Sequence, residues 1–165
     1  MLPPVYYTHM LDVLMTIPLW YTALAAFGFG VIIGSFLNVV IYRFHTGKSL
    51  SGSSHCLSCQ TDLRWYELFP LLSYLTLRGR CRSCSASIPG RYFWVELATG
   101  LLFMLVALML SPWYWLFGVM IVSILVVVAV YDLYHMVIRN FFVWLWFLLT
   151  LLTAVLDYWL LPDLM

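Results

Sequence analysis

The sequence predicts an all-α polytopic membrane protein with about four transmembrane helices and one small loop domain between the first and the second. Three observations lead to this prediction. Only 9% of the residues are charged, against about a quarter in soluble domains, and 64% are hydrophobic. The apolar residues form separate runs of about 20 residues, which is the length that crosses a bilayer as a helix. In addition, 18% of the residues are aromatic, and Trp and Tyr are typical of membrane interfaces.

The four predicted spans cover residues 19–42, 92–110, 113–131 and 141–161. Ser111-Pro112 separates the second span from the third, which predicts a tight helical hairpin. Residues 43–91 and 132–140 are then the other two connections. Residues 1–18 have no early Lys or Arg and no small-residue cleavage site, so we interpret them as an extramembrane or interfacial segment rather than a signal peptide.

The basic residues predict the orientation of these spans. Of the eight Lys and Arg residues, all but Arg139 lie in the 43–91 connection, and Arg139 lies in the 132–140 connection. Four crossings put both connections on the same side of the membrane. The positive-inside rule therefore places the loop domain in the cytoplasm and both termini on the opposite side. The lipid bilayer is the partner that this composition indicates, and no nucleic-acid partner is expected.

The loop between the first two spans contains all four cysteines of the chain. Their pattern is C-x2-C-x21-C-x2-C, which is close to that of two turns closing one tetrahedral zinc site, and the ligands would be Cys56, Cys59, Cys81 and Cys84. Two disulfides or four unused thiols are the alternatives. A reducing cytoplasm argues against disulfides. Four sulfur ligands leave no open position for water, so we predict a structural site, with the adjacent His55 outside it.

The segment between the two cysteine pairs, residues 65–77, is apolar almost all round. Such a segment is not stable in water on its own, so we expect it to lie on the membrane face or to pack against the transmembrane helices. The loop domain is too short to hold a core of its own. The sequence therefore predicts a small metal-stapled cap that rests on the helical bundle.

Several polar residues interrupt the apolar spans or flank them. Gly30, Gly34 and Asn38 share one face of the first span, where the glycines allow close helix approach and the Asn38 amide faces a neighbouring helix. Packing alone is an equally good explanation for this face. Arg43 ends the span as an interfacial anchor.

Two acids also stand out. Glu96 lies about one turn into the second span, and an acid there needs a partner, for which we predict Arg91 or another basic residue of the loop. Asp132 ends the third span, where the helix dipole disfavours negative charge. An acid in an unfavourable place is a modest indication of function.

Four stretches occur here in the order and spacing of a known family. They are GSFLNVVIYR (34–43), ELFPLLSYLTLRGRC (67–81), GRYFWVELATG (90–100) and YDLYHMVIRN (131–140), together with the paired C-x2-C. In these the chain strongly resembles the bacterial type IV prepilin peptidases, which are bifunctional leader peptidases and N-methyltransferases. The resemblance covers roughly residues 23–140.

The resemblance implies a polytopic aspartic peptidase of the bacterial inner membrane. Its members cleave the basic leader from type IV prepilins and type II secretion pseudopilins, and then methylate the new N-terminal amine with S-adenosylmethionine. It implies that the four-cysteine loop is the zinc-binding insertion of the family. It also places Asp132 at the first of the two catalytic aspartates. No glycine-rich loop of the soluble methyltransferase type indicates where the cofactor would bind.

The chain departs from the family pattern in two places. Arg139 stands where relatives usually have proline, and the Gly-x-Gly-Asp motif that carries the second aspartate does not occur among the 165 residues. An aspartic peptidase needs one ionised and one protonated carboxyl close together, so Asp132 alone cannot supply both. Asp157 follows 25 residues later, about 37 Å away along a helix. Glu67 is on the cytoplasmic side but comes from the cysteine loop rather than from a helix.

Two functions are therefore weighed. In the first, the chain is a prepilin peptidase-family enzyme or the N-terminal part of one, which could act with the missing half supplied by a second polypeptide. We expect no cleavage by these residues alone. Alternatively, it is an inactive or truncated homologue that acts as a membrane-anchored zinc module and binds pilins or assembly proteins. A reading frame immediately after codon 165 that encodes Gly-x-Gly-Asp would favour a split enzyme, and Asp132-dependent cleavage by this chain alone would contradict the expected lack of cleavage.

Overall fold

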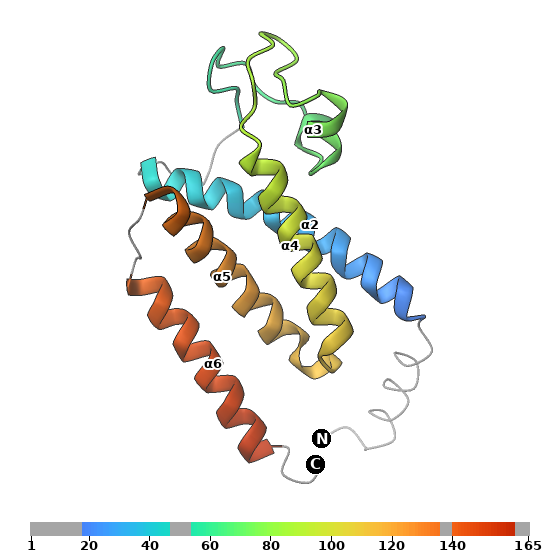
Figure 1. The fold of residues 1–165 in the computed structure, drawn as a ribbon, viewed down its shortest axis with the longest axis vertical. Helices are drawn as coiled ribbons and strands as arrows, with labels where there is room; N and C mark the ends of the chain where they lie inside the picture. The colour runs from blue at the N-terminus through green and yellow to red at the C-terminus, as the bar shows by residue number, and fades with distance from the viewer. Residues whose placement is uncertain (1–17, 47–53, 136–139, 161–165) are drawn as a thin grey trace.

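The computed structural model describes residues 18–46, 54–135 and 140–160, and it is helical with short loops (Figure 1). The predicted segment 1–18 and residues 136–139 of the third connection lie outside the described residues, apart from Pro18. The elements in chain order are α2 (Leu19–Thr46), the 3-10 helix η1 (Trp65–Leu68), α3 (Leu72–Thr76), α4 (Arg91–Met109), the 3-10 helix η2 (Pro112–Tyr114), α5 (Trp115–His135) and α6 (Asn140–Leu160).

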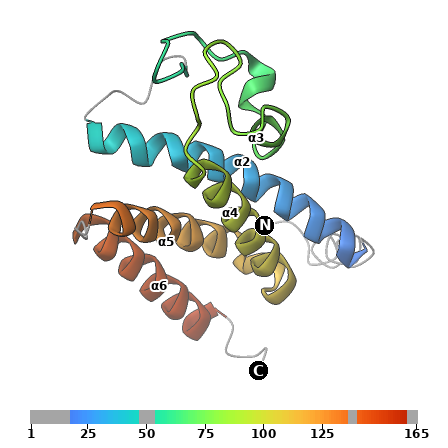
Figure 2. The same ribbon diagram turned by 45° about the horizontal axis from the view of Figure 1, so that its top comes forward.

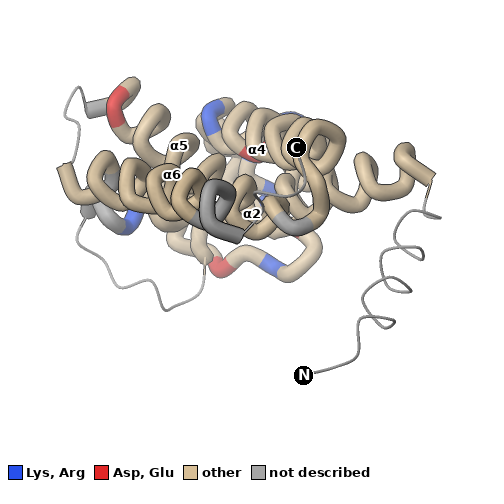
Figure 3. The backbone as a smooth tube through the Cα atoms, turned by 90° about the horizontal axis from the view of Figure 1, so that it is seen from below, with Lys and Arg blue, Asp and Glu red and all other residues tan. Residues whose placement is uncertain are grey.

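The helices have the lengths and composition of a membrane protein. Three described stretches are long and apolar enough to cross a bilayer, and a shorter apolar stretch, Val143–Val155, lies within α6; the three are Leu19–Arg43, Arg91–Met109 and Trp115–Tyr134. Charged residues of the long helices lie only within two turns of an end (Figure 3). Side chains such as Phe29, Ile32 and Phe36 are each more than half exposed, which suits contact with lipid tails rather than water. The all-α membrane fold is confirmed.

Helices α2 and α4 cross at close range because glycines lie at the crossing (Figure 2). A Cβ atom on Gly30 would lie 2.7 Å from the Cβ of Phe103, and one on Gly34 would lie 2.9 Å from the Cα of Glu96. From the other side, a Cβ on Gly100 would lie 2.6 Å from a methyl group of Val31. Small residues let backbones approach in this way. The crossing fixes where the N-terminal end of α4, and thus the loop domain, sits on α2.

The crossing predicts a position-specific effect of adding a side chain. We expect Gly30→Val to lower the free energy of unfolding in detergent micelles by about 1–3 kcal/mol, because the new methyl groups overlap the α4 backbone. Gly28→Val is the matched control, since a Cβ on Gly28 meets nothing within 4 Å. Thermal unfolding followed by circular dichroism measures both variants. Equal destabilisation by the two substitutions would contradict the close crossing.

Helix α5 completes the core on the side away from the loop domain. The buried cluster joins Leu37 and Ile41 of α2, Val95 of α4, and Val126 and Val127 of α5. Helix α6 lies alongside α5 (Figure 1). Helix α5 continues to His135, four residues beyond the predicted apolar span, which ends at residue 131. Asp132 therefore lies in the last turn of the helix.

Candidate functional site

Residues 54–90, here called the cysteine module, fold into two turns that bring the four cysteines together. In the first turn the Cys56 N–H donates to Thr61 O (2.9 Å) and the Gln60 N–H to Cys56 O (3.0 Å). The second turn repeats both bonds, from Cys81 N–H to Ala86 O (2.8 Å) and from Ser85 N–H to Cys81 O (2.9 Å). Gln60 and Ser85 also share a left-handed backbone, with φ of 60° and 57°.

The repeated turn places the four sulfur atoms within 4.8 Å of one another. Two of the separations are 3.8 Å, between Cys56 and Cys84, and 4.0 Å, between Cys59 and Cys81. Four thiolates around one tetrahedral ion with metal–sulfur bonds of about 2.3 Å lie about 3.8 Å apart, so these two separations are close to the spacing that such an ion requires. The cysteines form no disulfide in the structure. The arrangement is compatible with a structural metal site.

Local hydrogen bonds favour the thiolate form of two of these ligands. Hydrogen bonding with the Thr61 side chain, whose hydroxyl lies 3.3 Å from the sulfur, and with the Thr61 backbone lowers the pKa of Cys59 to about 6. The backbone N–H groups of Cys84 and Ser83 lower the pKa of Cys81. The thiolate is the form that binds a metal, so these bonds reduce the cost of deprotonation at neutral pH.

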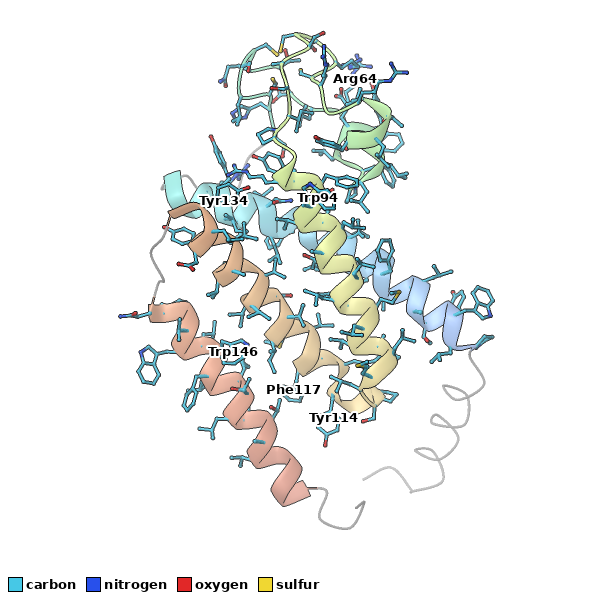
Figure 4. The ribbon with its side chains drawn as sticks, in the orientation of Figure 1. Arg64, Trp94, Tyr114, Phe117, Tyr134 and Trp146 are labelled. Carbon is cyan, nitrogen blue, oxygen red and sulfur yellow. The ribbon has the colours of Figure 1, made fainter. Side chains whose placement is uncertain are left out.

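Glu67 ties the apolar segment to the second cysteine turn. Its carboxylate accepts from the Arg64 N–H (2.8 Å) and forms an ion pair with the Arg82 guanidinium (2.9 Å). The Arg64 backbone bond, followed by the charge of Arg82, holds the pKa of Glu67 below its usual value. Figure 4 shows Arg64 at the edge of the module that points away from the long helices α2, α4, α5 and α6. Glu67 therefore links the start of η1, through Arg64, to the second cysteine turn, through Arg82.

Glu96 joins the cysteine module to the helices, and its partner differs from the one predicted. Its Oε2 atom accepts a hydrogen bond from the backbone N–H of Leu71 (2.8 Å), and the side chain is bonded to Ser35 of α2 as well. The prediction that Arg91 or another basic residue of the loop pairs with Glu96 is wrong for the residues that the structure describes. On a helix two residues five apart point about 140° from each other, so the two side chains leave α4 in different directions.

Arg91 instead connects α4 to the end of α5. Its guanidinium carbon lies 5.1 Å from the ring centroid of Tyr92 and 5.3 Å from that of Tyr134. Figure 4 shows Tyr134 at the end of α5 that faces the module and Tyr114 at the opposite end of the hairpin. Asp132 is two residues from Tyr134 and is half-buried. It makes no ion pair or hydrogen bond with the part of the chain that the structure describes.

A cavity of about 770 Å³ lies between the cysteine module and the adjoining ends of α2 and α4. We call it the interface cavity. Four of the predicted polar candidates line it: Asn38, Arg43, Glu67 and Glu96. Arg91 and Asp132 do not. At its base the Asn38 amide donates to Tyr92 O (3.1 Å), which holds α2 to the first turn of α4. The structure thus brings together candidates that are up to 58 positions apart in sequence, from Asn38 to Glu96.

Ser35, Tyr74 and Phe93 also line the interface cavity, and sequence reasoning did not single them out. The sequence could have indicated Ser35, because it lies three positions before Asn38 and therefore on the same side of the helix. It could not have indicated the two aromatic residues, since rings are abundant throughout this chain. Their centroids lie 5.4 Å apart, which packs α3 against the first turn of α4. The apolar segment of the module therefore rests on a transmembrane helix, as its composition predicts.

Comparison with known proteins agrees with the motifs. The family model described as "Bacterial Peptidase A24 N-terminal domain" matches residues 29–110. A "Type 4 prepilin-like proteins leader peptide-processing enzyme" from Escherichia coli O78:H11 is 41% identical over 146 residues, which cover 76% of this chain and 54% of the relative.

Two further relatives are each named "Prepilin leader peptidase/N-methyltransferase". The protein from Myxococcus xanthus is 44% identical over 118 residues, covering 70% of this chain and 35% of that protein. The one from Aeromonas salmonicida is 34% identical over 160 residues, which cover 81% of this chain and 55% of that protein. No solved structure gives a significant match. The chain spans about half the length of the curated relatives it matches, or less. By its motifs, its helical fold and these identities, the chain belongs to the bacterial prepilin leader peptidase/N-methyltransferase family.

Proposed function

We propose that these residues form the N-terminal part of a prepilin leader peptidase/N-methyltransferase. Such an enzyme cleaves the basic leader of type IV prepilins or type II secretion pseudopilins and methylates the new N-terminus with S-adenosylmethionine. One observation supports this most directly: the half-buried Asp132 lies at the end of the helical bundle that also carries the cysteine module. Substrate leader, acid and module would then meet at one membrane surface.

The same surface gathers the cations that the structure describes, which are Arg43, Arg64, Arg78, Arg80, Arg82 and Arg91. This distribution supports a cytoplasmic position for the module in the bacterial inner membrane, with both termini periplasmic. Asp132 would be one of the two catalytic carboxyls. In the proposed role its ionised form takes a proton from the attacking water, while the partner carboxyl, protonated, polarises the scissile carbonyl.

The metal of the cysteine cluster would be Zn²⁺, because four thiolates suit this ion and fill its coordination shell. Cys56, Cys59, Cys81 and Cys84 would hold it. With no open position, the ion would stabilise the module and would take no part in proton transfer or cleavage. The second aspartate would come from a Gly-x-Gly-Asp segment, either in further residues of the protein or in a second polypeptide.

A complementation assay tests this function. The chain is reconstituted in lipid vesicles with a prepilin, alone and together with a separately expressed C-terminal segment of a relative that contains Gly-x-Gly-Asp. We expect leader removal and N-methylation, both read by mass spectrometry, only when both polypeptides are present. If a folded and metal-loaded pair gives neither product, the function is refuted, and the alternative of a membrane-anchored zinc module that binds pilins or assembly proteins takes its place.

A further inference from the structure

The interface cavity contains a buried carboxylate that no described cation neutralises. Glu96 is 8% exposed, and it lies in the second turn of α4 at the membrane boundary. Its hydrogen-bond donors are the neutral Leu71 N–H and the Ser35 side chain. The other acid of the cavity, Glu67, is paired with Arg82 at 2.9 Å. Removing a carboxylate from water is costly unless a proton or another positive charge neutralises it, so a cationic occupant of the cavity would stabilise the ionised form of Glu96.

Aromatic rings beside Glu96 add to this preference. Tyr74 of α3 and Phe93 of α4 both line the interface cavity, and their ring centroids are 5.4 Å apart. The face of an aromatic ring attracts a cation, most strongly when the cation is partly removed from water. Cages of rings beside a carboxylate suit alkylated onium groups, whose charge is spread over apolar substituents. The remaining wall is largely apolar, with Val39, Leu77 and Ile88 among its residues, and Arg43 of α2 is the other cation of the described lining besides Arg82.

We propose that the interface cavity binds the onium group of a larger ligand, with Glu96 as its counter-charge and Tyr74 and Phe93 as its ring contacts. The choice of probes rests on the proposed function, since methyl transfer to a pilin involves two such groups. One is the ammonium at the new N-terminus, and the other is the sulfonium of S-adenosylmethionine. Both share the chemistry that Glu96 and the rings recognise, and the volume of about 770 Å³ is within the range of cavities that hold drug-sized ligands.

Glu96 also has a structural role, and the test separates the two. Its hydrogen bond is made to the backbone of Leu71, which has a positive φ of 57° that is unfavourable for a residue with a bulky side chain. Glutamine keeps an oxygen acceptor for the Leu71 N–H but has no charge. Glu96→Gln therefore preserves the contact between module and helix while it removes the counter-charge.

The experiment measures affinity for matched pairs of probes by equilibrium binding to the full chain in lipid nanodiscs. The first pair is S-adenosylmethionine and S-adenosylhomocysteine, which lacks the sulfonium charge. The second is an apolar peptide amide with a free N-terminus and its N-acetylated form. We expect the charged member of at least one pair to bind about tenfold more tightly than its neutral partner, equivalent to about 1.4 kcal/mol. The pair that shows this preference identifies the group.

Glu96→Gln should abolish the preference, whereas Asp62→Asn, which alters an exposed acid of the module outside the cavity lining, should retain it. Val39→Trp, which fills the cavity from α2, should block binding of the charged probe even if Glu96→Gln fails to fold. Metal content of one ion per chain serves as the check of folding. Absence of any charge preference, its survival in Glu96→Gln, or binding to metal-loaded Val39→Trp would overturn the inference. Methyl transfer in the complementation assay would in that case still support the proposed function, with its cofactor bound elsewhere.

Discussion

Replacing Cys56 and Cys59 together with serine should remove about one zinc ion per chain and unfold the cysteine module. The two residues form one side of the cluster, and the sulfur atoms of Cys84 and Cys81 lie 3.8 Å and 4.0 Å from them. Two remaining thiolates bind the ion far more weakly than four. Structural zinc sites contribute folding free energy directly, so its loss unfolds the domain that it holds.

The module has little else to stabilise it. Of residues 54–90 only Gly79 and Cys81 are buried, and the apolar side chains Leu72 and Leu75 are more than half exposed. Elemental analysis gives the metal content, and limited proteolysis of the chain in nanodiscs reports the state of the module. Ser58→Ala is the control, because Ser58 lies between the two cysteines and is exposed. A double variant that lacks metal yet resists protease as the parent does would show that the module folds without it.

The second large effect is expected for Asp132→Asn in the complemented enzyme. If Asp132 is one of two catalytic carboxyls, an amide there can neither accept a proton from water nor share one with its partner. We expect leader cleavage to slow by about 10²–10⁴-fold, the usual contribution of an acid–base group. Quantitative mass spectrometry of the released leader measures the rate.

Methylation provides an internal control for that variant. Methylation of a pilin supplied without its leader needs no cleavage and therefore no aspartate pair. The Asp132→Asn enzyme should methylate such a pilin at the parental rate. Asp62→Asn, at an exposed acid of the module, should change neither reaction. Cleavage by Asp132→Asn at the parental rate would remove Asp132 from the mechanism, whereas equal loss of both activities would indicate that the substitution damages the fold.

Much of the fold follows from local features of the sequence. Apolar runs of about 20 residues predict the long helices. Gly30 and Gly34 share one face of α2, which predicts that another helix crosses α2 at close range on that face. The two C-x2-C pairs predict the sulfur cluster because each pair needs only one tight turn. The end of α5 was less well defined, since the charge of Asp132 ends an apolar run but does not end a helix.

The contacts of Glu96 could not be predicted in the same way. Its partner Leu71 is 25 positions away and contributes a backbone N–H, which every residue except proline possesses. The left-handed positions Gln60, Leu71 and Ser85 carried no glycine to indicate a reversal of the chain. The stacking of Arg91 on Tyr134 depends on how α4 and α5 are placed, which hydropathy does not determine. Sequence thus predicted the long helices and the clustering of the four cysteines, while the interface cavity arose from tertiary packing.

The contact between Arg91 and Tyr134 links two parts of the molecule mechanically. Arg91 is the residue where the chain leaves the cysteine module and enters α4, and Tyr134 shares the final turn of α5 with Asp132. A cation stacked on an exposed ring contributes only about 0.5–1 kcal/mol, so this contact holds the boundary of the module to the end of α5 only weakly. If the module shifts on the bundle, the contact would break before it moved a packed helix, and the last turn of α5 would keep its own position.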